Sequence, residues 1–288
     1  MKNIHWLGSG LSSIPGIRRL ASNNYNLTVW NRTLSKAQKS IDHVKTDKVS
    51  AKTFNINEIE KKVEQGDIIV SQLTASMHLD IAKICLEKKC HFVTTSYLAP
   101  DIKKLNEQAV AQNLTFINEV GLDPGIDHFF SHLLVQELKS LNLNNLSVSY
   151  KSYCGGVPAV PNDFKYKFSW SPVGVIKALN SPAKFTQNFE EKLVPQPYKE
   201  VKNHLINSES FEAYPNRDSL PYIEEYLFSP EWKIKEFVRG TLRLNGWTLA
   251  WREIFNMLEK QEANIEEQIQ QKSNELWKNY RYDKNEED

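Results

Sequence analysis

The sequence has few cysteines, no long apolar run and almost no excess of charge of either sign. Its three cysteines, Cys85, Cys90 and Cys154, are an odd number without metal-ligand spacing, which indicates free thiols in a reducing compartment. No stretch approaches the roughly 18 apolar residues of a membrane span, and the first apolar run is too short for a signal peptide. The 36 basic and 35 acidic side chains give no support for a nucleic-acid or membrane partner. We therefore expect a cytoplasmic protein that acts on a small molecule.

The 288 residues are enough for two domains, and the texture of the sequence changes near the middle of the chain. Short apolar runs alternate with helical runs at first, which is typical of a doubly wound parallel sheet. The predicted strands there are 3–7, 27–30, 49–54, 67–72, 91–97 and 114–117. Later alternating runs at 146–153, 165–170, 183–213 and 232–244 predict a mixed sheet.

The fold class that follows is α/β, with a Rossmann-type domain joined to an α+β domain of mixed sheet. We place the dinucleotide-binding domain at residues 1–122, completed by helices from 246–288. The α+β domain, at residues 123–245, is expected to bind the substrate. Apolar residues from Trp247 to Leu258 recur at helical spacing and predict packing, back onto the first domain.

A glycine-containing turn, Gly8-Ser9-Gly10-Leu11-Ser12-Ser13, lies between the first strand and the first helix. Gly8 permits a tight turn, and Gly10 lets the backbone approach a pyrophosphate at the helix N-terminus. The third small position of the fingerprint is Ser13. We predict that Gly8, Gly10, Leu11 and Ser12 contact a dinucleotide; a bare turn between strand and helix is the alternative.

The second strand ends in Asn31-Arg32-Thr33, without the acidic residue that holds the ribose 2′-hydroxyl in NAD-binding proteins. A guanidinium can bind a 2′-phosphate bidentately, so we predict NADP(H), with Arg32 and Thr33 on the phosphate and Asn31 nearby. An ordinary solvated arginine is the alternative. Leu73 and Thr74 follow the fourth strand and are expected near the nicotinamide ribose.

The stretch from Asn118 to His128 joins the part of the chain with alternating strands and helices to the part with the mixed sheet. Its Asp-Pro-Gly turn comes directly before an apolar helical run, at the end of the last strand of the first domain. Ligands of open α/β sheets bind outside the carboxyl ends of the strands, so Asp123 is a candidate acid beside the nicotinamide. An Asx-turn or helix cap is the alternative for Asp123, and His78 and His128 are expected to pack or cap.

Several strings resemble the saccharopine reductase family, that is, saccharopine dehydrogenases of the NADP-dependent, L-glutamate-forming type. The likeness covers roughly residues 1 to 250. The strings that carry it are Asn118 to His128, Tyr153-Cys154-Gly155-Gly156-Val157-Pro158-Ala159, Lys167-Phe168-Ser169-Trp170-Ser171 and Tyr214-Pro215-Asn216-Arg217-Asp218-Ser219. Shorter strings that fit are Asn31-Arg32-Thr33, Thr94-Thr95-Ser96-Tyr97 and Val238-Arg239-Gly240-Thr241-Leu242-Arg243.

The resemblance implies a reaction of lysine metabolism. Glutamate and 2-aminoadipate 6-semialdehyde condense to an imine, which NADPH reduces to saccharopine, and the reverse reaction reduces NADP. It also implies a homodimer, formed through the second domain, and no metal.

The resemblance further implies catalytic roles for Asp123, Tyr97 and Cys154. Tyr97 would donate to the imine nitrogen or to a carboxylate, with a packed aromatic as the alternative. Cys154 would be a substrate-contact thiol, with a buried small apolar residue as the alternative. A glycine such as Gly155 lets the backbone lie close to a ligand.

Saccharopine carries three carboxylates, so the site needs cations. Arg217 is the first candidate, since its fork binds a carboxylate bidentately, and Asn216 would add an amide donor. The alternative is that Arg217 only ties its loop to an acid. Trp170 is expected to shape the pocket or the domain interface. Arg239 and Arg243, four residues apart on one strand, are expected to share a face and to be structural.

The sequence departs from the family pattern in the short loop 157–164, in Val173 where we expect an arginine, and in an early end of the chain. These departures leave two further hypotheses. One is a related imine reductase for another aldehyde and amine, such as a carboxylated polyamine precursor. The other is a regulatory protein that binds NADPH without turnover.

Overall fold

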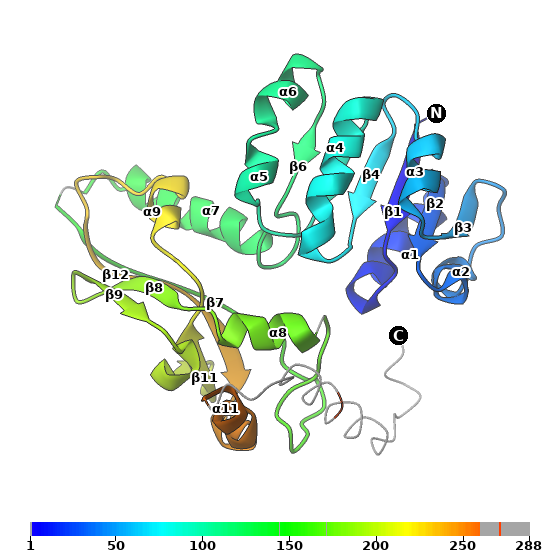
Figure 1. Ribbon diagram of the computed structural model, residues 1–288. Coiled ribbons are helices and arrows are strands. Elements are labelled where there is room, and N and C mark those ends of the chain that lie inside the picture. Colours follow the sequence, from blue (N-terminus) through cyan, green and yellow to red (C-terminus); the bar gives the residue numbers. More distant parts are fainter. Residues whose placement is uncertain (1, 144, 171, 260–270, 272–288) are drawn as a thin grey trace. The chain divides into compact units, whose positions relative to one another are not determined.

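The computed structural model describes residues 2–143, 145–170, 172–259 and 271. The chain forms two compact units that divide between Phe130 and Ser131, within helix α7 (Ile126–Ser140). The predicted boundary, between residues 122 and 123, lies in the loop that precedes this helix. Each unit has its own sheet, seen as arrows in Figure 1.

The sheet of the first unit has six parallel strands in the order β3-β2-β1-β4-β5-β6. This is the strand order of the Rossmann fold, and the order reverses between β1 and β4. The predicted doubly wound sheet is therefore confirmed. The strands are β1 (Asn3–Leu7), β2 (Asn26–Asn31), β3 (Val49–Thr53), β4 (Ile68–Ser71), β5 (His91–Thr94) and β6 (Phe116–Ile117).

The strands of this sheet bury side chains toward two apolar clusters. On β1, Ile4 and Trp6 join the cluster that contains Ile17 of α1, whereas Leu7 joins the cluster that contains Ile81 of α4. Side chains that point to either side of the strand are therefore buried. This explains why these strands are continuous apolar runs and do not alternate between apolar and polar residues. The helices are η1 (Leu11–Ser13), α1 (Ile14–Ser22), α2 (Leu34–Ile41), α3 (Ile56–Lys62), η2 (Ala75–Met77), α4 (His78–Lys88), α5 (Pro100–Lys103) and α6 (Asn106–Ala111).

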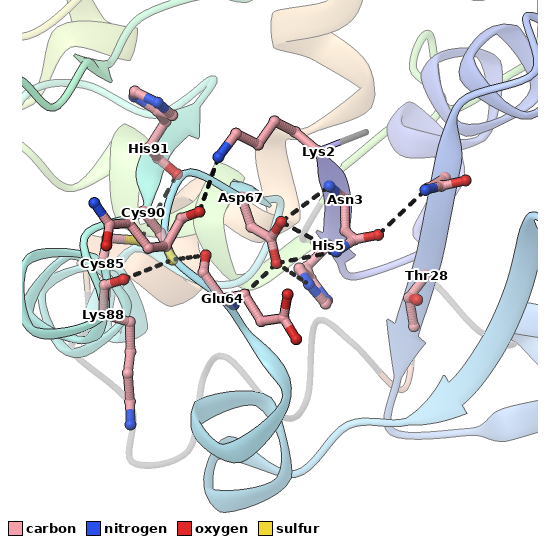
Figure 2. Close-up of polar contacts among 12 residues, drawn as sticks. Lys2, Asn3, His5, Thr28, Glu64, Asp67, Cys85, Lys88, Cys90 and His91 are labelled. Atoms are coloured by element: carbon pink, nitrogen blue, oxygen red, sulfur yellow. Dashed lines mark hydrogen bonds and ion pairs between the residues drawn. The ribbon is translucent and has the colours of Figure 1, made fainter.

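A buried polar cluster lies where β1 begins and where the chain enters β4 (Figure 2). The Asp67 carboxylate accepts hydrogen bonds from the backbone N–H groups of Asn3 (2.9 Å) and Glu64 (3.0 Å), and lies 3.3 Å from Nε2 of His5. Burial raises the pKa of Asp67, but the Glu64 and Asn3 amides and His5 outweigh it, so this pKa is lowered overall. Trp30 Nε1 donates to His5 Nδ1 (3.3 Å), and burial lowers the pKa of His5.

The second unit has a mixed sheet in the order β10-β11-β12-β8-β9, with β7 paired in parallel to β12. The other pairings are antiparallel, and the hairpins β8–β9 and β10–β11 lie largely within the predicted run 183–213. The strands are β7 (Ser147–Cys154), β8 (Ala183–Gln187), β9 (Glu190–Val194), β10 (Lys202–Ile206), β11 (Glu209–Pro215) and β12 (Lys233–Leu244). The helices are α8 (Pro172–Leu179), η3 (Pro197–Glu200), α9 (Pro221–Glu225), α10 (Trp247–Ala250) and α11 (Arg252–Glu259).

Two expectations about the second unit are corrected. Residues 165–170 form no strand, although Tyr166 and Phe168 are buried as their alternation indicates. Their rings pack against Trp251 in place of pairing with a strand. The helices after residue 246 are also placed differently, because α10 and α11 pack into a core of the second unit through Trp247 and Phe255. The rest of 246–288 lies outside the described residues, apart from residue 271.

Candidate functional site

The turn after β1 requires glycine at its first position. Gly8 has φ +97°, and a Cβ built there would lie 2.7 Å from the backbone oxygen of Gln72. Gly10 differs, because a Cβ there would meet nothing within 4 Å. Leu11 and Ser12, at the start of η1, are exposed. The turn thus presents an open backbone face at Gly10, directly before a helix N-terminus, where anions bind favourably.

Asn31 at the end of β2 connects this turn to the start of α2. Its Nδ2 donates to Ser9 Oγ (2.5 Å), and its Oδ1 accepts from the Thr33 backbone N–H (3.0 Å). Arg32 and Thr33 are exposed, and within the described ranges no carboxylate pairs with the Arg32 guanidinium. Asn31 therefore has a local structural role, while Arg32 and Thr33 remain accessible to a phosphate.

The carboxyl ends of β4 and β5 are joined by His78. Its Nδ1 lies 3.0 Å from Ser71 Oγ and its Nε2 lies 2.8 Å from Ser96 Oγ, and burial lowers its pKa. Of the two residues expected near the cofactor here, Leu73 packs against the apolar core, whereas Thr74 is exposed. At this edge Thr74 offers a side chain to a ligand, and Leu73 offers only its backbone.

Tyr97 and Asp123 are brought together by two loops at this edge of the sheet. The Tyr97 hydroxyl donates to Asp123 Oδ1 at 2.7 Å, and both residues are half-buried. The amide of Gly125, just before α7, donates to Oδ1 of Asp127 (2.7 Å). Asp127, in the first turn of α7, thus binds the amide that directly precedes the helix.

The loop that carries Asp123 is closed backbone against backbone. The Gly121 amide donates to the Pro124 oxygen (2.8 Å), and the Asp123–Pro124 peptide bond is cis. A Cβ at Gly125 would lie 2.1 Å from the Gly121 oxygen. No other residue fits at Gly125 without moving the loop.

The candidate residues of the second unit come from the end of β7 and from the segment before α8. Cys154 is half-buried and lies opposite Thr241 of β12. A Cβ at Gly155 would lie 1.9 Å from the Leu242 backbone oxygen, so its close neighbour is β12, not an open ligand space. Trp170 is 49% exposed, and its ring lies against Gly174 of α8.

Arg217 and Asn216 lie in the loop after β11. The backbone N–H of Asn216 donates to the backbone oxygen of Arg239 (2.9 Å), and the backbone N–H of Lys184 donates to the backbone oxygen of Arg217 (2.9 Å). Arg217 is exposed and has φ +58°. A non-glycine residue in this region costs free energy, and such strain is concentrated at binding and catalytic sites.

Arg239 and Arg243 have their side chains in the interior. Arg239 lies over the ring of Tyr222 at 3.9 Å. Arg243 lies over the rings of Tyr166, at 4.8 Å, and Trp247, at 5.3 Å. These contacts support the structural interpretation of Arg243, since cations over aromatic faces stabilise a packed core.

Three residues that contribute contacts here are not among the predicted site residues. Ser9 meets Asn31, His78 meets Ser96, and Glu119 accepts a hydrogen bond from the Leu98 backbone N–H (2.8 Å). Each contact joins segments that are far apart along the chain, so only the fold shows it. Among the described residues, no group of three His, Cys, Asp or Glu side chains is placed to hold a metal ion. No helix in this part of the chain is long and apolar enough to cross a membrane.

The strand order and the glycine turn at the switch point define a dinucleotide-binding protein of the Rossmann class. Comparison with known families identifies the family within this class. Residues 4–117 match the saccharopine dehydrogenase NADP binding domain, and residues 121–288 match the saccharopine dehydrogenase C-terminal domain. The chain belongs to the saccharopine dehydrogenase family. The predicted family is thereby confirmed, and the domain match supports the predicted cofactor, NADP(H).

Relatives of known activity are similar over most of the chain. Saccharopine dehydrogenase [NADP(+), L-glutamate-forming] from Pyricularia oryzae is 35% identical over 85% of this chain and 55% of its own length. The enzyme of the same name from Schizosaccharomyces pombe is 36% identical over 86% of this chain and 56% of its own length. The chain thus spans about half the length of the relatives it matches.

A solved structure confirms the fold. Apo saccharopine dehydrogenase (L-Glu forming) from Saccharomyces cerevisiae superposes with a TM-score of 0.74 at 33% identity. The match covers 86% of this chain and 56% of the yeast chain.

Proposed function

We propose that the protein is an NADP-dependent oxidoreductase that interconverts saccharopine with glutamate and 2-aminoadipate 6-semialdehyde through an imine. The observation that carries the proposal is the Tyr97–Asp123 hydrogen bond at the carboxyl edge of an NADP-type Rossmann sheet. The full-length relatives carry the name of this reaction, and this chain shares both of their family domains.

The first unit would bind the cofactor. The open backbone at Gly10 and the helix that follows fit the pyrophosphate, and Arg32 and Thr33 fit a 2′-phosphate. NADP supplies the hydride chemistry when it is bound. The protein then has to position the substrate and manage one proton.

Tyr97 and Asp123 would manage that proton. When saccharopine is oxidised, the secondary amine loses a hydride from carbon and a proton from nitrogen, and water then adds to the imine carbon and releases glutamate. A hydroxyl that already donates to a carboxylate at 2.7 Å can pass a proton between the substrate nitrogen and that carboxylate. The half-buried position of both residues limits competition from water.

The second unit would recognise the amino-acid substrate. Arg217 supplies an exposed guanidinium at a strained backbone position, and Asn216 supplies an amide. Cys154 and Trp170 are the further contacts that we propose, whereas Gly155 contributes close packing against β12.

The proposal includes a cytoplasmic homodimer. Support for a dimer comes from α7, where Phe129, Phe130, Leu133 and Leu134 are each at least 59% exposed. Such a stripe of large apolar side chains is typical of an association surface. Light scattering of Leu133→Glu beside the unmodified protein tests it, and equal masses for both would remove α7 from the interface.

The decisive experiment is reduction of NADP by saccharopine, followed at the nicotinamide absorbance. We expect turnover with NADP preferred over NAD, and a loss of kcat in Tyr97→Phe with NADPH binding unchanged. NADPH binding without turnover of saccharopine would overturn the proposed reaction. A panel of other aldehyde and amine pairs would then separate a related imine reductase from a non-catalytic NADPH-binding protein.

A further inference from the structure

Glu119 holds the backbone on both sides of Tyr97. Its own N–H donates to the Ser96 oxygen at 3.1 Å, and its side-chain Oε1 accepts from the Leu98 N–H at 2.8 Å. Residues 96 and 98 flank Tyr97 directly. One residue thus fixes the main chain before and after the tyrosine, which sets where the hydroxyl can reach.

The second oxygen of the same carboxylate reaches the helix that follows the Asp123 loop. Oε2 of Glu119 lies 3.0 Å from Nε2 of His128, in the first turn of α7. The other ring nitrogen of His128 lies 3.7 Å from Oδ2 of Asp127. The Glu119 and His128 side chains are only 23% and 15% exposed, so water has little access to this contact.

Glu119 also has an unfavourable backbone conformation, with φ +60°. Glutamate is a poor choice there, because its Cβ crowds the backbone and Gly or Asn adopts this region more readily. Such a conformation persists where surrounding contacts over-determine it. Here one backbone contact and one side-chain contact of Glu119 hold the residues on either side of Tyr97, and a second side-chain contact reaches the start of α7.

We propose that Glu119 is a positioning residue that sets the hydrogen bond between Tyr97 and Asp123. The carboxylate does not act on the substrate; it ties the Tyr97 loop to α7, which begins directly after Asp123-Pro124-Gly125. The inference rests on the proposed function only in assigning proton handling to this pair.

Three substitutions separate the side chain of Glu119 from its backbone. Glu119→Gln keeps an acceptor for the Leu98 amide and a polar group for His128. Glu119→Ala removes both contacts and keeps the strained φ. Glu119→Gly removes both contacts and relieves the strain, so it remains informative if the alanine variant fails to fold. Circular dichroism checks the fold of each variant.

The first measurement is NMR of protein labelled with ¹³C at the ζ carbon of tyrosine, which reports the hydrogen bond and ionisation of the phenol. The resonance lost in Tyr97→Phe assigns Tyr97. We expect this resonance to shift in the Ala and Gly variants and to stay in place in the Gln variant. An unchanged resonance in Glu119→Gly, or an equal shift in all three variants, would overturn the proposal. This measurement needs no turnover.

The second measurement is a double-mutant cycle on saccharopine oxidation. We expect Glu119→Ala to lower kcat by about 10- to 100-fold and to leave KM for NADP within about twofold, because misplacement of a reacting group costs rate. In the Tyr97→Phe background the same substitution should change kcat by less than about twofold. Multiplicative losses would show that Glu119 acts independently of Tyr97. If the unmodified protein does not oxidise saccharopine, the proposed function fails, and the NMR result alone decides the role of Glu119.

Discussion

The buried pair of His5 and Asp67 makes the first unit sensitive to mild acid. Trp30 Nε1 is a donor only, so the His5 Nδ1 that it contacts must act as an acceptor. The imidazole is therefore neutral, with its proton on Nε2, directed at Asp67. A second proton on Nδ1 would face the Trp30 N–H group. These two N–H groups would face each other, which disfavours protonation of His5 further. Burial already lowers the pKa of His5.

The direction and size of the effect follow from proton linkage. In the unfolded chain His5 takes up a proton as the pH falls through 6.5, whereas folded His5 stays neutral until a lower pH. Its stabilising effect is full above pH 6.5 and is lost as the pH falls toward the folded-state pKa. The slope is at most about 1.4 kcal/mol per pH unit, so the loss between pH 7 and pH 5 is at most about 2 kcal/mol.

His5→Gln tests this effect, because an amide can donate toward Asp67 and accept near Trp30 but does not titrate. Urea unfolding at pH 7 and pH 5, followed by ¹⁹F NMR of 5-fluorotryptophan, reports the first unit through the Trp30 resonance. That resonance is assigned with Trp30→Phe. His78, whose pKa burial also lowers, is present in both proteins and cancels in the difference. The pKa of Asp67 is lowered from 3.8, so its carboxylate does not titrate between pH 7 and pH 5.

We expect the unmodified protein to lose more stability than His5→Gln between the two pH values, by up to about 2 kcal/mol. Equal losses in both proteins would refute the assignment of a neutral, locked His5. A smaller difference that stops growing above pH 5 would place the folded-state pKa of His5 closer to 6.5.

Three further predictions concern the two candidate binding regions. Arg32→Ala should weaken NADPH binding by roughly tenfold or more and leave NADH binding unchanged, because only NADPH carries the 2′-phosphate. Fluorescence titration measures the binding of both cofactors, and Arg18→Ala, at another exposed arginine, is the control. Arg217→Ala should raise KM for saccharopine more than tenfold in steady-state kinetics, with Arg252→Ala as control, and an unchanged KM would remove Arg217 from the site. Gly8→Ala should cost about 2 kcal/mol or more of stability in urea unfolding, since its Cβ would lie 2.7 Å from a backbone oxygen at φ +97°; a normal midpoint would show that the turn can relax.

The sheet of the first unit could be predicted because its strands are short apolar runs separated by glycine and polar turns. The run 67–72, for example, contains β4 (Ile68–Ser71) with one residue to spare at each end. Turn chemistry likewise located the loop at Asp123-Pro124-Gly125. These signals depend only on residues that are neighbours in the sequence, so they can be detected without knowing which segments pack together.

The predictions that failed concern which segments of the chain pack against one another, which a single sequence does not specify. Tyr166 and Phe168 alternate with lysines as in a strand, yet Trp251 covers their rings and no strand pairs with them. The apolar stripe of α11 predicted a packed helix, and we expected the first domain to receive it, but the helix packs into a core of the second unit. Gly155 is predicted to bring the backbone close to a ligand, and the neighbour that the structure shows is the backbone of Leu242.

The loop that holds Asp123 also affects how variants should be interpreted. Every substitution at Gly125 inserts a Cβ 2.1 Å from the Gly121 oxygen, so all of them perturb the same main-chain geometry whatever their chemistry. Leu122 lies between Gly121 and Gly125 in the sequence, is 70% exposed, and should be replaceable by most other residues. In a saturation library, position 125 would resemble a catalytic residue in its intolerance while contributing no functional group. Loss at Gly125 therefore reports the shape of the loop, and only a near-isosteric change such as Asp123→Asn reports its chemistry.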